Sequence, residues 1–87
     1  MKTFFLTFRS ITQAQRAERA FAKAGMAVIL RRTPRWMEER GCGYGVEVKC
    51  AELREGLAVL RREKISFRKS YLLHGDGLVE ELRHDLS

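Results

Sequence analysis

The order in which strand-like and helix-like segments follow each other constrains this fold most. Four segments alternate apolar and polar residues as strands do, and two carry apolar residues at helical spacing. Strands are expected at 2–8, 26–33, 43–49 and 65–73, and helices at 12–24 and 51–63. With right-handed crossovers, this β-α-β-β-α-β order predicts an α+β, ferredoxin-like sandwich. Its four-stranded antiparallel sheet has the order 4-1-3-2 and two helices on one face.

The C-terminal residues are expected to extend this domain. Residues 1–74 form the ferredoxin-like part, and residues 75–87 are predicted to be a helical tail of the same domain. The tail begins with Gly75-Asp76-Gly77, a sequence typical of a turn. A short closing helix is then predicted over 78–86, with an apolar face made by Leu78, Val79, Leu82 and Leu86.

Size and charge limit the functions that this chain can have. At 87 residues it is one small domain with a thin core, so chemistry must take place at an edge rather than in a large internal cavity. The formal net charge of +6 favours acidic partners, including nucleic acid and acidic protein surfaces. The first apolar run ends at Arg9, too early for a signal peptide, and no segment is long enough to span a membrane, so we expect a cytoplasmic protein. Both histidines, His74 and His84, are C-terminal, so no Cys-His or Ser-His-Asp site is expected, and an independent enzyme is not predicted.

The segment 34–42 interrupts the strand pattern and contains the main candidate for chemistry, Cys42. This cysteine lies between Gly41 and Gly43, which let the backbone approach a ligand closely. Cys50 ends the third strand about 26 Å away, whereas a disulfide needs Cα atoms within about 7 Å, so the two thiols cannot pair. Cys50 is instead expected to be a small core residue.

The predicted topology places the 34–42 segment beside the start of the first helix. Ser10 and Thr12 are candidate N-caps of that helix, so Cys42 is expected to lie near them. Positive charge and a helix N-terminus both stabilise a thiolate, which is the reactive form. The arginines expected around this end are Arg9, Arg31, Arg32, Arg35 and Arg40. Cys42 is therefore predicted to be a reactive thiol; the alternative is a turn cysteine that merely fits between glycines.

A family resemblance supports the reactive interpretation. It is carried by a strand ending at Phe8 and followed by Ser10 and Thr12, Ala14 and Glu18 on the helix, Pro34-Arg35 after strand two, and Cys42-Gly43 before strand three. Over roughly residues 2–72 this pattern resembles the putative selenium/sulfur carrier protein-like family of small bacterial proteins. The sequence departs from it at residues 38–41, which read Glu-Glu-Arg-Gly in place of a Ser-rich run.

The resemblance implies a carrier that needs no metal or organic cofactor. The thiolate of Cys42 would accept sulfur or selenium from a persulfide donor such as a cysteine desulfurase and pass it to an acceptor protein. Arg35 would lie in the same loop.

Two binding functions remain as alternatives. The run from Arg40 to Tyr44 partly matches the third strand of an RNA-recognition motif. However, Tyr44 shares its side of the strand with Val46 and Val48, so it should pack under the helices and not stack on bases. RNA binding would then depend on phosphate contacts from basic loops. As a protein-binding module, the chain could use Phe5 beside Ile29, or the 78–86 tail, to form a homodimer or hold a partner helix.

Overall fold

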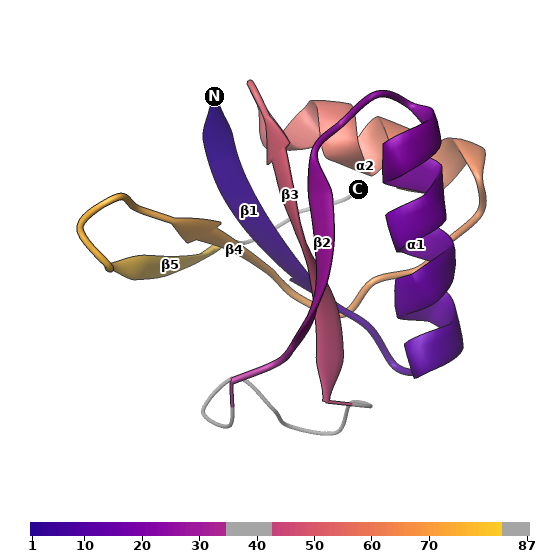
Figure 1. The fold of residues 1–87 in the computed structure, drawn as a ribbon, viewed down its shortest axis with the longest axis horizontal. Helices are drawn as coiled ribbons and strands as arrows, with labels where there is room; N and C mark the ends of the chain where they lie inside the picture. Colours follow the sequence, from indigo (N-terminus) through magenta and orange to yellow (C-terminus); the bar gives the residue numbers. More distant parts are fainter. Residues whose placement is uncertain (35–42, 83–87) are drawn as a thin grey trace.

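The computed structural model describes residues 1–34 and 43–82, which form two helices packed on one antiparallel sheet (Figure 1). In chain order the elements are β1 (Lys2–Thr7), α1 (Ile11–Lys23), β2 (Val28–Arg32), β3 (Tyr44–Cys50), α2 (Leu53–Arg62), β4 (Ser70–Leu73) and β5 (Val79–Leu82). Neither helix in these ranges is long and apolar enough to cross a membrane.

The sheet has the order β2-β3-β1-β4-β5, with every neighbouring pair antiparallel. The order 4-1-3-2 predicted for the first four strands is therefore present. The predicted strand count is wrong, because a fifth strand extends the sheet beyond β4. The α+β class is confirmed.

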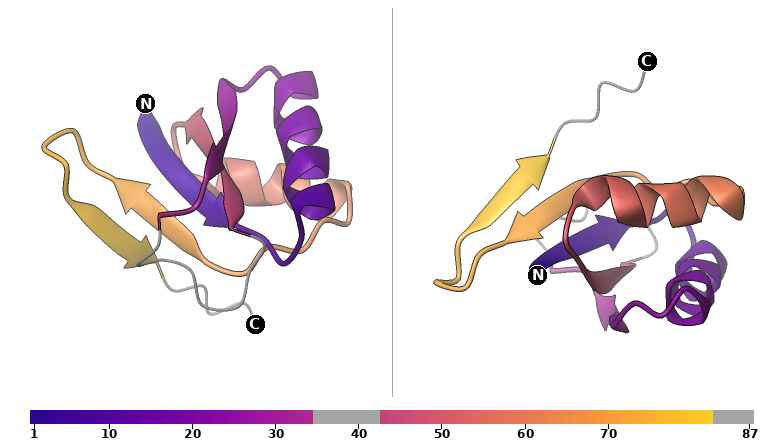
Figure 2. Two further views of the ribbon diagram at one scale, coloured as in Figure 1. Left: turned by 60° about the horizontal axis from the view of Figure 1, so that its bottom comes forward. Right: turned by 90° about the horizontal axis from the view of Figure 1, so that it is seen from above.

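The short C-terminal helix predicted over 78–86 is also wrong, since residues 79–82 form β5 and pair with β4 (Figure 2). A hairpin turn determines this outcome. The His74 N–H donates to the Leu78 carbonyl (2.8 Å), the Asp76 carboxylate accepts from the Leu78 N–H (3.0 Å), and Gly77 takes φ 93°. The apolar residues here suit either a helix or a strand, but the turn returns the chain directly onto β4. Residue 86 lies outside the described residues.

The side of β3 that faces the helices was predicted correctly. Val46 and Val48 are fully buried in the main core, and Tyr44 packs against it. Strands and helices contribute together to this core, through Phe4, Leu6, Ala14, Ala17, Phe21 and Leu60 among others. Val28 and Leu30 pack against the same core from β2, as the alternation of that strand predicts.

The open face of the sheet carries a second apolar cluster, which corrects the prediction for Phe5. Phe5 and Tyr71 lie opposite each other on β1 and β4 and are each 3% exposed, with Leu73 packed against them. β3 separates Phe5 from Ile29, because Glu47 pairs with both. Phe5 is thus a core residue, whereas Ile29 is 51% exposed.

The first helix begins with a side-chain cap. The Ser10 hydroxyl accepts a hydrogen bond from the Gln13 N–H (3.2 Å), as expected for an N-cap residue. Thr12 lies inside the first turn and is exposed, so Ser10 alone has the predicted cap role. Gly25, with φ 84°, ends the helix.

Candidate functional site

The candidate site lies where β2 ends and β3 begins. The Thr33 N–H donates to the Gly43 carbonyl (2.7 Å), and Arg32 pairs with Tyr44 in the adjoining register position. Gly43 has φ 80°, a left-handed conformation that L-residues rarely adopt. The glycine directly after Cys42 is therefore required by the backbone that enters β3.

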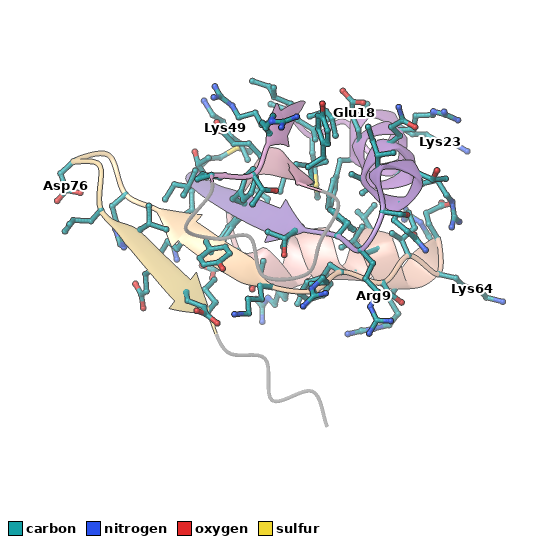
Figure 3. All side chains as sticks on the ribbon, turned by 90° about the horizontal axis from the view of Figure 1, so that it is seen from below. Arg9, Glu18, Lys23, Lys49, Lys64 and Asp76 are labelled. Carbon is teal, nitrogen blue, oxygen red and sulfur yellow. The ribbon has the colours of Figure 1, made fainter. Side chains whose placement is uncertain are left out.

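Other elements meet at this end of the sheet, at the bottom of Figure 1. Thr7, the last residue of β1, pairs with Gly45 of β3. On its other side Thr7 exchanges backbone hydrogen bonds with the segment before β4: its N–H donates to Lys69 O (2.9 Å) and its carbonyl accepts from Arg68 N (2.7 Å). The chain then continues through Arg9 and Ser10 into α1. Figure 3 views the molecule from this end and labels Arg9.

The basic residues at this end are partly compensated. Arg31 forms an ion pair with Glu47 (3.0 Å), and Lys69 lies 3.7 Å from a carboxylate oxygen of Glu81. Arg32 donates to the Tyr44 hydroxyl (3.3 Å) and lies 5.4 Å from the centre of its ring. Arg9 is exposed and has no acidic partner among the described residues, and the first turn of α1 contains no acid. Arg9 and the N-terminus of α1 therefore add positive potential at this end, and Arg32 keeps its charge because its described partner is a hydroxyl and not a carboxylate.

The predicted site residues divide into two groups. Arg9, Ser10, Thr12 and Gly43 belong to the described part of the chain and lie on elements that meet at this end of the sheet. The other predicted site residues, Arg35, Arg40, Gly41 and Cys42, lie outside the described residues. The expected proximity of Cys42 to Ser10 and Thr12 stays a prediction.

Cys50 has the properties of a structural thiol. It is 1% exposed, and its Sγ donates a hydrogen bond to the Glu52 carbonyl oxygen (3.2 Å). Burial raises the pKa of this thiol, with smaller increases from Glu55 and Glu52 and a decrease from the Gly56 backbone. A protonated and inaccessible thiol is a poor nucleophile, so the predicted role of Cys50 as a core residue is confirmed.

Sequence reasoning missed several residues at this end. Arg68 and Lys69 lie beside Thr7, whose side-chain oxygen also accepts from the Lys69 N–H (3.1 Å). Their position follows from the antiparallel pairing of β1 and β4, so the topology contained the signal. A cavity of about 360 Å³ on the open face, also unpredicted, reaches from Phe5 and Val79 to Pro34, where β2 has ended. Among the residues that the structure describes, no group of His, Cys, Asp or Glu is arranged to hold a metal ion.

Comparison with known protein families identifies the family of this chain. The model of the family described as putative Se/S carrier protein-like matches residues 3–72. The chain belongs to this family. The matched span contains the predicted site residues Arg9, Ser10, Thr12 and Gly43 and both sides of the 35–42 segment. No curated protein and no solved structure matches the chain.

Proposed function

We propose that this member of the Se/S carrier-like family carries sulfur or selenium on the thiolate of Cys42. The observation that carries the proposal is the family match across residues 3–72, which includes Cys42, together with the burial of the other thiol. Of the two cysteines, Cys50 is closed to a donor by its 1% exposure and its raised pKa. Cys42 is thus the thiol that a donor protein would reach.

The chemistry is a transfer of sulfane sulfur. The Cys42 thiolate attacks the outer sulfur of a donor persulfide, the S–S bond of the donor breaks, and the donor leaves as a thiolate. Cys42 then holds the persulfide until a nucleophile of an acceptor protein attacks the same outer sulfur. No net oxidation occurs, and selenium would follow the same steps.

The surroundings of residue 43 support thiolate chemistry. Arg9 and the N-terminus of α1, whose first turn has no acid, contribute positive potential at this end of the sheet. Such potential lowers the pKa of a nearby thiol below the ordinary value of about 8.5. The protein would act with a separate donor enzyme and an acceptor, in the reducing cytoplasm, and not as an enzyme by itself.

The RNA-binding alternative receives no support from the sheet. Tyr44 packs on the helix side, and the open-face aromatics Phe5 and Tyr71 are buried, so the described strands offer no exposed stacking platform.

Persulfide loading tests the proposal. The protein is incubated with a cysteine desulfurase and cysteine, and its intact mass is measured. Wild type and Cys50→Ser should gain an adduct of about 32 Da, whereas Cys42→Ser should not. Absence of the adduct from Cys50→Ser, or its presence on Cys42→Ser, would refute the assignment.

A further inference from the structure

The outer edge of β2 is a free strand edge among the described residues. β2 is the last strand of the sheet on this side. Its hydrogen bonds to β3 include Lys49 N–H to Ala27 O (3.0 Å) and Thr33 N–H to Gly43 O (2.7 Å). In an antiparallel pair, every second residue directs its backbone N–H and C=O toward the neighbouring strand, so residues 27, 29, 31 and 33 hydrogen-bond to β3. The N–H and C=O groups of Val28, Leu30 and Arg32 therefore point outward.

This edge lacks several common protections against pairing. Exposed edges are usually shortened, bulged, covered, or protected by proline or charged side chains. On β2 the charges of Arg31 and Arg32 protect only its C-terminal end. β2 instead begins with the apolar run Val28-Ile29-Leu30, and the Ile29 side chain is 51% exposed. We propose that the edge pairs with the same edge of a second copy, antiparallel and around a two-fold axis, to form a homodimer with one continuous sheet.

The two-fold register centred on Leu30 satisfies this edge. Leu30 then lies opposite the partner's Leu30, and Val28 lies opposite the partner's Arg32. The outward backbone groups of Val28, Leu30 and Arg32 therefore all lie opposite outward backbone groups of the partner, so their N–H and C=O groups can form hydrogen bonds across the interface. On the open face Ile29 lies opposite the partner's Arg31, and like charges do not oppose each other directly.

The helix layer is compatible with this pairing. α1 packs on both β2 and β3, and neighbouring strands are about 4.8 Å apart, so the two-fold places the α1 axes about 10 Å apart, an ordinary packing distance. Arg16, Arg19 and Lys23 are spaced to share one flank of α1, where Arg16 donates to the Glu63 carbonyl (3.1 Å).

The opposite flank of α1 would face the partner. Figure 3 shows Glu18 on the flank of α1 next to β2 and Lys23 on the side away from it. Residues at helical spacing with Glu18 are Ile11, Gln15 and Ala22. This flank has no basic residue, and it includes Ile11, a large apolar side chain that is 40% exposed. Two copies of a chain with net charge +6 can therefore approach here without opposing cations.

The other edge of the sheet fits a closed dimer less well. His74 N bonds to Leu78 O (2.8 Å), so only Val79 and Glu81 of β5 point outward. Pairing β2 with β5 of another copy would be head-to-tail and would produce rings or open filaments rather than a two-fold dimer. The antiparallel β2 dimer instead leaves its two candidate sites at opposite ends of the joint edge, and it does not depend on the carrier function.

Sedimentation equilibrium of the full chain, under reducing conditions that prevent disulfide dimers, tests the proposal. Wild type should have about twice the monomer mass of 10.1 kDa. Ile29→Lys places lysine opposite the partner's Arg31 twice and should raise the dimer Kd at least about tenfold. Ile29→Glu, the matched control at the same exposed position, should leave the Kd equal or lower. Arg32→Pro removes an outward N–H that β3 does not use, at a position whose side chain is exposed, and should yield a folded monomer.

Hydrogen exchange provides a second readout. The amides of Leu30 and Arg32 should exchange more slowly as protein concentration rises. The proposal would be overturned if wild type keeps the monomer mass at protein concentrations up to about 0.5 mM, or if Ile29→Lys leaves the dimer Kd unchanged. Assemblies larger than a dimer that disappear in the Glu81→Lys variant would overturn the proposed dimer and would favour pairing of β2 with β5.

Discussion

Replacing Gly45 with alanine should strongly destabilise the fold. Gly45 lies on the open face of β3, and the Phe5 ring covers it. A Cβ at this position would overlap the backbone carbonyl oxygen of Leu6 and would lie 2.7 Å from Cζ of Phe5. β1 and β3 are hydrogen-bonded neighbours inside the sheet, so the Leu6 carbonyl cannot move without disturbing their pairing.

The expected loss is about 2–3 kcal/mol, within the range for overpacking a core. For a domain of this size, that corresponds to a fall in Tm of roughly 10–20 °C. Chemical denaturation monitored by circular dichroism measures it. Gly75→Ala is the matched control, because nothing lies within 4 Å of its added Cβ, and it should change stability by less than about 0.5 kcal/mol.

A double-mutant cycle identifies the cause. Phe5→Leu removes the ring that the added methyl group would strike, so Gly45→Ala should cost less in the Phe5→Leu background than in wild type. A Gly45→Ala variant as stable as wild type would mean that Phe5 does not pack over β3, and the assignment of the open-face core would be wrong.

Two further predictions concern Cys50 and Ser10. The pKa of Cys50 is raised in the folded protein, so the unfolded chain loses this proton first as pH rises, and the thiol reduces stability above about pH 8.5. Cys50→Ala should therefore flatten the decline of the unfolding free energy between about pH 8 and pH 10. An unchanged slope would contradict burial as the cause of the raised pKa. Ser10→Ala should cost about 1 kcal/mol through loss of the hydrogen bond from Gln13 N, measured by thermal unfolding, while Thr12→Ala should cost clearly less; equal losses would contradict Ser10 as the cap.

Local patterns were enough to predict most of the fold. The alternation of Tyr44, Val46 and Val48 predicted which face of β3 packs under the helices. The order of the elements along the chain predicted the spatial order of the first four strands in the sheet. β5 was missed because Leu78, Val79 and Leu82 suit a helix as well as a strand. The decision came from hydrogen bonds around Gly77, which apolar spacing does not encode.

Features that depend on strand register were harder to predict. Phe5 is buried because Tyr71 lies opposite it, and this pairing is known only once β4 is aligned with β1. Lys69 lies beside Thr7 for the same reason. At the candidate site, the glycines beside Cys42 were predicted to free the backbone for unusual φ values, and the φ of 80° at Gly43 is such a conformation. The role of Cys42 itself stays a prediction that only chemistry can test.

The most direct test of the carrier function is a complete cycle of loading and discharge on Cys50→Ser protein, followed by intact mass and peptide mapping. The account predicts that a sulfur adduct of about 32 Da forms on Cys42 with a persulfide donor and disappears when a thiol acceptor is added. An adduct that never forms on Cys42, or that forms and cannot be passed on, would contradict the carrier function.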